Sequence, residues 1–281
     1  MTMDDVTEAV RAYWDIDAKT YDDSASHYPR TAAEQAAWSA ALRRLLPPPP
    51  AKVLDVGAGT GFLSILLARQ GYAVTALDLA PGMLARLREK AGSAGLDVRT
   101  AEGDAAEPPR DNFDAVVERH LLWTLLGPGT TLDAWHEAAP TGRLVLLESL
   151  WGAPGGRTEQ LRRGCQTVLR RLRGQRPDHH ADYDPEVRAR FPLGAGATPE
   201  RLVTLVESST WGTARLERLR DVLGSLPPVR KPEIYAENPF APLEDITLTR
   251  DRLGFEPKFD ARNVCILTPP AGVEANSGAA S

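Results

Sequence analysis

The sequence predicts an α/β fold built on a doubly wound parallel sheet. Apolar runs of strand length alternate with runs of helix length between about residues 51 and 151. A glycine-rich turn, from Asp55 to Gly61 in the run DVGAGTG, joins the first strand of this stretch to its first helix. Repeated units of this kind place parallel strands side by side through right-handed helical crossovers.

The elements of this core can be assigned in chain order. Residues 1–46 are expected to be helical, and the run Pro47–Pro50 ends them as a stiff spacer. The expected strands are 53–56, 72–79, 96–103, 113–118 and 143–150. The expected helices are 61–70, 81–90 and 131–139. Gly71 suits a C-terminal helix cap, and Pro81 suits a first helical turn.

The pattern changes after residue 151. Residues 152–197 are expected to form a helical insertion that covers the substrate, with an arginine-rich helix at 159–173. That helix presents either a solvated basic face or a lid surface for an acidic group. The core is then completed by residues 198–268, which we expect to contain a helix at 198–209, strands at 212–222 and 259–268, and a proline-rich loop at 223–257. The tail 269–281 is expected to be disordered.

Composition limits the classes of function. The chain has 281 residues and a formal net charge of −5, whereas nucleic-acid binding usually needs a basic surface. Its two cysteines, Cys165 and Cys265, form no close-spaced metal or redox motif. No apolar run reaches the roughly 18 residues of a membrane helix, and the first residues do not resemble a signal peptide. We therefore expect a cytoplasmic protein with a small-molecule substrate, no metal, no nucleic-acid partner and no membrane partner; its oligomeric state stays open.

The glycine-rich turn indicates a bound ligand. Three glycines allow a tight turn and let a ligand approach the backbone closely, and the N–H groups at the helix start add an electropositive surface. A dinucleotide site would have the pattern G-x-G-x-x-G, but here the third glycine comes one residue early and Phe62 follows it. A nicotinamide-dependent oxidoreductase is thus an alternative that the spacing disfavours.

Acidic residues follow the successive strands of the predicted sheet. Asp78 ends the second strand, and Asp104 follows the third. Because ligands of such sheets bind outside the carboxyl ends of the strands, these carboxylates should face one crevice. Asp78 can accept two hydrogen bonds from a ribose diol, and Asp104 can accept one from an adenine amine. Either residue alone also suits a helix cap or a turn.

The runs VLDVGAGTGFLS, VTALDLAPGML, AEGDAAEPP and FDAVVERHLLWTL resemble class I S-adenosylmethionine-dependent methyltransferases, of the small-molecule, natural-product branch. The resemblance covers about residues 50–150 most closely, and YWDIDAKTYD resembles the helix that covers the cofactor in that branch. It implies a Rossmann-like sheet of seven strands with the last strand antiparallel. It also implies S-adenosyl-L-methionine as the cofactor, and transfer of its methyl group to a nitrogen or oxygen atom of a metabolite.

The resemblance further implies a set of cofactor contacts. The glycines and Asp55 would lie near the methionine part, Asp78 at the ribose, Asp104 and the Ala105 backbone at the adenine, and Arg119 near the methyl end, while two tyrosines would close over the cofactor. The implied cofactor-binding residues are Tyr13, Tyr21, Asp55, Gly57, Ala58, Gly59, Gly61, Asp78, Leu79, Met83, Asp104, Ala105 and Arg119.

His120 is the candidate catalytic base, because it follows the fourth strand and titrates near neutrality. The alternative is that it only caps or packs at the start of a helix. Glu118 is the second candidate, and it has the same structural alternative. The adjacent His179 and His180 lie in a polar run of the insertion and are either solvated or close to the site. Trp123 and Trp151 either pack in the core or line the acceptor pocket.

A catalytically silent module that binds the cofactor and regulates a partner is the remaining alternative. The cofactor-binding pattern is compatible with it, whereas the large insertion between residues 152 and 197 favours an enzyme with its own acceptor.

Overall fold

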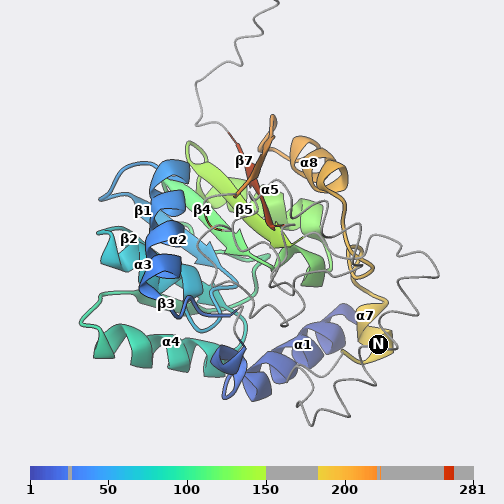
Figure 1. The fold of residues 1–281 in the computed structure, drawn as a ribbon. Coiled ribbons are helices and arrows are strands. Elements are labelled where there is room, and N and C mark those ends of the chain that lie inside the picture. The colour runs from blue at the N-terminus through green and yellow to red at the C-terminus, as the bar shows by residue number, and fades with distance from the viewer. Residues whose placement is uncertain (25–26, 150–182, 220–221, 223–262, 269–281) are drawn as a thin grey trace, which may run out of the picture.

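The computed structural model of the chain describes residues 1–24, 27–149, 183–219, 222 and 263–268 (Figure 1). Several expectations lie outside these residues: the arginine-rich helix 159–173, the loop 223–257 and the tail 269–281. His179, His180 and Trp151 also lie outside them.

Two helices precede the sheet. Helix α1 spans Met3–Asp17 and α2 spans Ala32–Leu45, with a 3-10 turn η1 at Tyr21–Asp23 between them. Each helix begins with a capping box, formed by Thr2 with Asp5 in α1 and by Thr31 with Glu34 in α2. In a capping box the two residues satisfy each other's backbone N–H groups, which fixes where the helix starts. The N-terminal region is thus helical as predicted, but in two helices separated by a turn.

Five parallel strands form the centre of the sheet, in the order β3-β2-β1-β4-β5. Their bounds are Lys52–Val56 (β1), Ala73–Asp78 (β2), Arg99–Glu102 (β3), Ala115–Arg119 (β4) and Arg143–Ser149 (β5). The helices that connect them are α3 (Phe62–Arg69), α4 (Pro81–Ser93) and α5 (Pro128–Ala138), with a 3-10 turn η2 (Leu122–Thr124) after β4. The predicted α/β core is confirmed, with α4 ending three residues later and α5 beginning three residues earlier than predicted.

Two further strands extend the sheet beyond β5. Strand β7 (Asn263–Leu267) pairs antiparallel with β5, and β6 (Arg215–Arg218) pairs antiparallel with β7. Strand β6 is shorter than the segment predicted for it, and β7 lies within its predicted segment, of which residues 259–262 are outside the described part of the chain. Helix α8 (Pro199–Glu207) precedes β6, and the side chain of Thr198 caps it by accepting a hydrogen bond from the Arg201 N–H.

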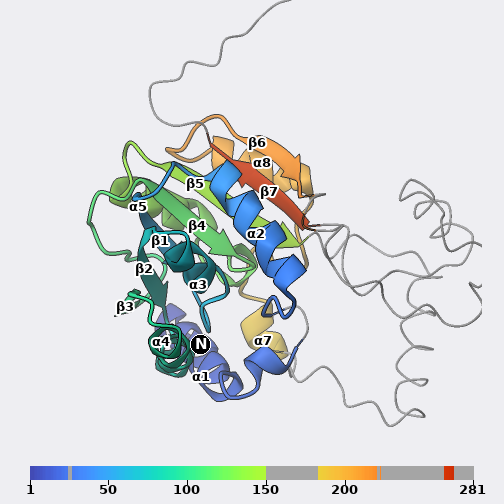
Figure 2. The same cartoon turned by 60° about the vertical axis from the view of Figure 1, so that its left-hand side comes forward.

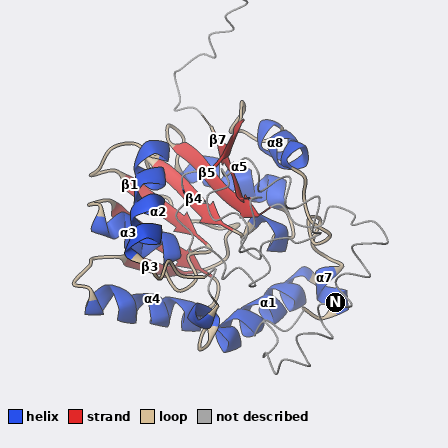
Figure 3. Ribbon diagram, in the orientation of Figure 1, coloured by secondary structure: helices blue, strands red, loops and turns tan. Residues whose placement is uncertain are grey.

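Helices cover both faces of the sheet, as Figures 2 and 3 show. Val117 of β4 belongs to an apolar cluster with α2 and α3, whereas its neighbour Val116 belongs to a cluster with α5 and α8. This alternation follows from the strand geometry, in which successive side chains point to opposite faces. Strands β1, β4 and β5 are therefore buried on both faces, and polar side chains concentrate at the strand ends.

In the part of the chain that the structure describes, the main helix contacts of α1 are with α4 and with the short helix α7 (Pro185–Arg188), and Figure 1 shows it running between these two helices. The first part of the chain thus lies beside α4, which follows β2, and beside α7, which follows β5.

Candidate functional site

The glycine-rich turn adopts the conformation that its residues predict. Gly57, Gly59 and Gly61 have φ values of +65°, +54° and +92°, which L side chains rarely adopt. A Cβ on Gly57 would lie 2.9 Å from Leu121, and one on Gly61 would lie 2.8 Å from Leu87. Among the described residues, a Cβ on Gly59 would meet only the ring of Tyr21, at 3.9 Å. Gly57 and Gly61 are therefore needed for packing, while Gly59 faces the space beneath Tyr21.

Asp78 holds the glycine turn and the start of α4 together. One carboxylate oxygen accepts a hydrogen bond from the Gly59 N–H at 2.7 Å, and the other accepts one from the Ala80 N–H at 2.8 Å. Burial raises the pKa of Asp78 to about 6 even though these bonds favour the ionised form. Each carboxylate oxygen keeps a second lone pair, so the group can still accept bonds from a ligand diol.

Asp55 lies below the turn, and its side chain is 1% exposed. It accepts a hydrogen bond of 2.5 Å from the Ser64 hydroxyl on α3. Burial raises the pKa of Asp55 to about 7, although the Ser64 bond acts in the opposite direction. In this structure Asp55 therefore stabilises the glycine turn through its hydrogen bond from Ser64 of α3.

Asp104 and Ala105 form the turn after β3. Asp104 accepts a hydrogen bond from the Ala106 N–H at 2.8 Å, as an Asx turn requires. The Ala105 carbonyl accepts one from the Trp135 indole N–H at 2.8 Å. Asp104 thus has the turn role that the sequence left open. The same turn lies at the edge of the sheet where β2 ends with Asp78.

The segment around η1 is tied to the glycine turn by Asp22. Its carboxylate accepts a 2.5 Å hydrogen bond from the Thr60 hydroxyl and forms a 2.8 Å ion pair with Lys90 of α4. A second tie joins α1 to α4, since Asp15 accepts a 2.5 Å hydrogen bond from the Gly82 N–H. Sequence reasoning missed Asp15 and Asp22, because acidic residues of a polar segment carry no signal of their distant partners.

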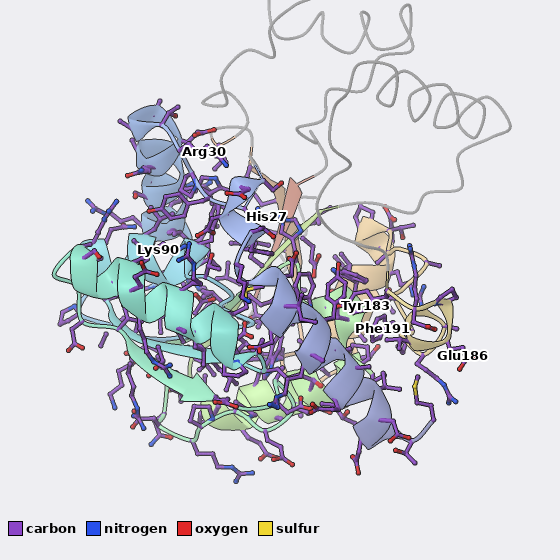
Figure 4. The ribbon with its side chains drawn as sticks, turned by 90° about the horizontal axis from the view of Figure 1, so that it is seen from below. His27, Arg30, Lys90, Tyr183, Glu186 and Phe191 are labelled. Atoms are coloured by element: carbon purple, nitrogen blue, oxygen red, sulfur yellow. The ribbon has the colours of Figure 1, made fainter. Side chains whose placement is uncertain are left out.

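Tyr21 lies over the glycine turn, as the contact with Gly59 shows. Its ring stacks on His27 with centroids 4.0 Å apart, and the His27 Nδ1 lies 2.9 Å from the Tyr21 carbonyl oxygen. In Figure 4, Lys90 lies on one side of the molecule, Tyr183 and Phe191 on the other, and His27 between them. Met83 is 2% exposed and belongs to an apolar cluster with Ala18 and Ala80, against which Trp14 and Tyr21 pack.

Arg119 ends β4 on the same face as α3. Its guanidinium lies 4.0 Å from the centroid of the Phe62 ring and 5.9 Å from that of Trp38. Burial lowers the pKa of Arg119, while Tyr21, Asp55 and neighbouring carboxyls raise it. A cation thus stands beside both the N-terminal segment and the glycine turn.

His120 follows Arg119 in an unusual backbone conformation. It is one of two described non-glycine residues with a positive φ, which is +61°. Its N–H donates to the Leu147 carbonyl at 3.1 Å. Burial, together with the charges of Arg119 and His27, lowers the pKa of His120 well below 6.5. The imidazole is therefore neutral near pH 7, the form that can accept a proton.

Glu118 is fully buried and bonds to the loop that follows it. One carboxyl oxygen accepts a hydrogen bond from the Leu121 N–H at 2.8 Å. Glu148 of β5, which sequence reasoning did not single out, accepts one from the Leu122 N–H at 3.1 Å. Burial and the neighbouring Glu148 raise the pKa of Glu118 well above its ordinary value.

An aromatic cluster adjoins the loop after β4. Tyr183 stacks on Tyr13 of α1 at 4.5 Å and meets Trp123 and Phe191 edge-on at 5.6 and 5.4 Å. Tyr13 thus lies against the described end of the insertion. Sequence reasoning missed Tyr183 and Phe191, because nothing in their local pattern relates them to α1.

Two further findings concern metal ligation and membrane spanning. In the part of the chain that the structure describes, no three His, Cys, Asp or Glu side chains are grouped as metal ligands would be. Within the same residues, no helix has the length and apolar character needed to cross a membrane.

The fold and the site define a class of protein. A glycine turn follows the first strand of a parallel sheet, and Asp78 and Asp104 follow the next two strands, which is the place where doubly wound sheets bind nucleoside ligands. The general model of a methyltransferase domain matches residues 53–141, which include all of these groups.

Two curated methyltransferases are similar to this chain in sequence. The demethylmenaquinone methyltransferase of Deinococcus radiodurans is 33% identical over 181 residues, which are 62% of this chain and 73% of that protein. The ubiquinone biosynthesis O-methyltransferase of Xylella fastidiosa is 39% identical over 110 residues, which are 37% of this chain and 44% of that protein. The chain thus spans less than half the length of the latter relative.

A solved structure agrees on the fold. The magnesium protoporphyrin IX methyltransferase of Synechocystis PCC 6803, with bound S-adenosylhomocysteine, aligns with a TM-score of 0.50 and 20% identity over 75% of this chain and 91% of its own. The chain belongs to the class I S-adenosylmethionine-dependent methyltransferases, and its cofactor is S-adenosyl-L-methionine. This membership decides against the oxidoreductase alternative.

Proposed function

We propose that this chain transfers the methyl group of S-adenosyl-L-methionine to a hydroxyl or amine of a small-molecule metabolite, of the natural-product type. The observation that carries this proposal is the arrangement of Gly59, Asp78 and Tyr21. In the described part of the chain, a Cβ on Gly59 would have only the Tyr21 ring within 4 Å, and the same glycine donates its N–H to Asp78. The glycine turn, the Asp78 carboxylate and the Tyr21 ring thus lie around one space, in which we place the cofactor.

The residues present fit the cofactor. Asp78 would accept hydrogen bonds from the ribose hydroxyls, and Asp104 with the Ala105 backbone would meet the adenine. Ala58 and Leu79 flank this space in the chain. Gly57, Gly59 and Gly61 would admit the methionine part close to the backbone. Tyr21 would cover it, while Tyr13 and Met83 support the covering helix and Asp55 supports the turn.

When bound, the cofactor supplies an activated methyl group on a positively charged sulfur. The contribution of the chain is to exclude water and to hold the acceptor close and in line, which can supply several kcal/mol. The N-terminal segment, which Asp15 and Asp22 hold against α4 and the glycine turn, would exclude water. The residues that follow β4 would hold the acceptor.

His120 is the base that we propose for the acceptor's proton. Its neutral imidazole follows β4, and the strained backbone there indicates a conformation imposed by its surroundings. Glu118 is less suited to this role, because it is fully buried and bonds to the Leu121 N–H. His120→Ala should lower turnover while S-adenosylhomocysteine binds nearly as in the wild type; turnover at the wild-type level would place the base elsewhere.

The acceptor class rests on two supporting observations. The aromatic cluster of Tyr13, Trp123, Tyr183 and Phe191, in which Trp123 comes three residues after His120, provides apolar surface of the kind that suits a flat substrate. Two of the relatives are named for the biosynthesis of ubiquinone and for demethylmenaquinone. Both observations favour a small aromatic or quinone-like acceptor over a macromolecule.

Two measurements test this function. Calorimetry should show S-adenosylhomocysteine binding and no comparable binding of NADH. Protein incubated with methyl-labelled cofactor and a metabolite extract should then yield a labelled small molecule, detected by mass spectrometry. Tight binding of S-adenosylhomocysteine without any labelled product, across extracts that contain phenols and amines, would instead favour a module that binds the cofactor without turnover.

A further inference from the structure

Two buried carboxyl groups lie behind the loop that carries His120. Glu118 is 0% exposed and Glu148 is 3% exposed. Glu118 pairs in register with Leu146 on the neighbouring strand, and Glu148 lies two residues further along that strand. Because side chains alternate along a strand, both carboxyls point to the same face of the sheet, the one covered by α5 and α8.

The two carboxyls hold consecutive backbone groups of the loop. Glu118 accepts the N–H of Leu121, and Glu148 accepts the N–H of Leu122. The residue just before these two is His120, whose N–H is bonded to Leu147 and whose φ is +61°. Left-handed backbone costs a non-glycine residue about 1–2 kcal/mol, so it persists only where neighbouring contacts impose it. The bonds to Leu121 and Leu122 are such contacts.

The second carboxyl oxygen of Glu118 indicates that Glu118 and Glu148 are not both ionised. Glu118 Oε1 is buried and has no hydrogen-bond partner among the described residues. A bare carboxylate oxygen in that position would be costly, and two neighbouring carboxylates would also repel each other. A single proton on the pair removes both costs. Arg119 interacts electrostatically with both carboxyls and balances the one charge that remains.

We propose that Glu118 and Glu148 are positioning residues that share one proton and clamp the Leu121 and Leu122 N–H groups, which fixes His120 in its strained backbone conformation. The geometry of the clamp is independent of the methyl transfer proposed above. Its benefit for catalysis rests on that function, because it is His120 that we propose as the base.

The test compares two substitutions at one position. In Glu148→Gln, the amide oxygen still accepts the Leu122 N–H, and the amide N–H₂ can donate to Glu118 in place of the shared proton. In Glu148→Leu, both abilities are lost at similar size. Protein labelled with ¹⁵N-histidine is titrated by NMR with saturating S-adenosylhomocysteine, and His120→Asn identifies the His120 signals among those of the five histidines.

The expected results differ between the variants. In the wild type and in Glu148→Gln, His120 should stay neutral through pH 6–8. In Glu148→Leu its pKa should rise toward the ordinary value of about 6.5, and the Leu122 amide should exchange with solvent at least tenfold faster. If Glu148→Leu leaves both unchanged, or if Glu148→Gln behaves like Glu148→Leu, the clamp is refuted.

An infrared measurement tests the shared proton without a disruptive variant. The difference spectrum of wild type minus Glu148→Gln at pH 7.5 should contain the band of one protonated carboxyl group, and its absence would refute the shared proton. Affinity for S-adenosylhomocysteine is measured in the same samples. Failure of the wild type to bind it would count against the proposed function, whereas normal affinity with an unchanged His120 would count against the clamp alone.

Discussion

Replacing Gly59 with alanine separates the ligand-binding part of the glycine turn from its structural part. At +54°, φ of Gly59 would cost an alanine about 1–2 kcal/mol in the folded state. Its Cβ would meet the Tyr21 ring at an ordinary contact distance of 3.9 Å and no other group of the residues that the structure describes, so these add no clash. The methyl group would instead occupy the space in which we place the cofactor. Gly59→Ala should therefore be mildly destabilised and bind S-adenosylhomocysteine at least tenfold more weakly.

Gly61→Ala is the matched control, since it makes the same chemical change two residues later. Its Cβ would lie 2.8 Å from Leu87 Cγ and 3.3 Å from Ile65, in addition to the unfavourable φ of +92°. Overpacking of this kind typically costs about 1–3 kcal/mol, so the total loss should be about 2–5 kcal/mol. Here stability falls more than affinity does.

Urea denaturation gives the free energy of unfolding of both variants without ligand, and calorimetry gives their affinities for S-adenosylhomocysteine. The reasoning is refuted if Gly59→Ala binds as tightly as the wild type. It is also refuted if Gly59→Ala loses as much stability as Gly61→Ala, because the turn would then be a purely structural feature at both positions.

Three further predictions concern the charged groups of the site. Asp78→Ala should weaken the binding of S-adenosylhomocysteine about tenfold or more in calorimetry, because it removes charge-assisted bonds to the ribose; unchanged affinity would contradict the ribose assignment. The folded-state pKa values of Asp55 (about 7) and Asp78 (about 6) exceed the value of an unfolded aspartate, so the folded state binds more protons than the unfolded state between about pH 4 and 7. The free energy of unfolding of the ligand-free protein should therefore fall as the pH rises through this window. The fall should be up to about 1.4 kcal/mol per pH unit for each of the two groups. Asp55→Asn should flatten this slope in urea titrations, and an equal slope would show that other groups cause it. Asp22→Ala should speed dissociation of S-adenosylhomocysteine in stopped-flow measurements by severalfold, since it frees the covering segment, whereas the exposed Asp23→Ala should not; equal rates in both would remove the latching role.

The sequence predicted the parts of the fold that depend on local pattern. The strand, glycine turn and helix from β1 to α3 lie within about twenty residues, and glycine spacing together with apolar periodicity is enough to identify them. Asp78 could be placed at a strand end for the same reason. Asp104 could be placed after the third strand in the same way, and its bond from the Ala106 N–H shows the turn role that the sequence left open, while its contact with the adenine stays a prediction.

The contacts that close the site could not be predicted in this way. Asp22 meets Thr60 and Lys90 across 38 and 68 residues of sequence. Tyr183 meets Tyr13 across an even longer interval. Such pairs depend on how α1 is laid along the edge of the sheet, which is a property of tertiary packing and leaves no periodic signal. Glu148 was missed for a related reason, because in sequence it is one acid at the end of an apolar strand.

Helix α1 and the turn η1 that follows it are held to α4 and to α7 by different sets of interactions, and this has a practical consequence. Toward α4 they include the charged groups Asp15, Asp22 and Lys90, beside the apolar cluster of Ala18, Ala80 and Met83. Near α7 they are aromatic, through Tyr13 and Tyr183. Added salt screens charged contacts, whereas cooling and urea weaken apolar ones. Added salt should therefore weaken the ion pair between Asp22 and Lys90, whereas mild urea should weaken the stacking of Tyr13 on Tyr183, so the two attachments of the covering segment respond to different changes of solvent.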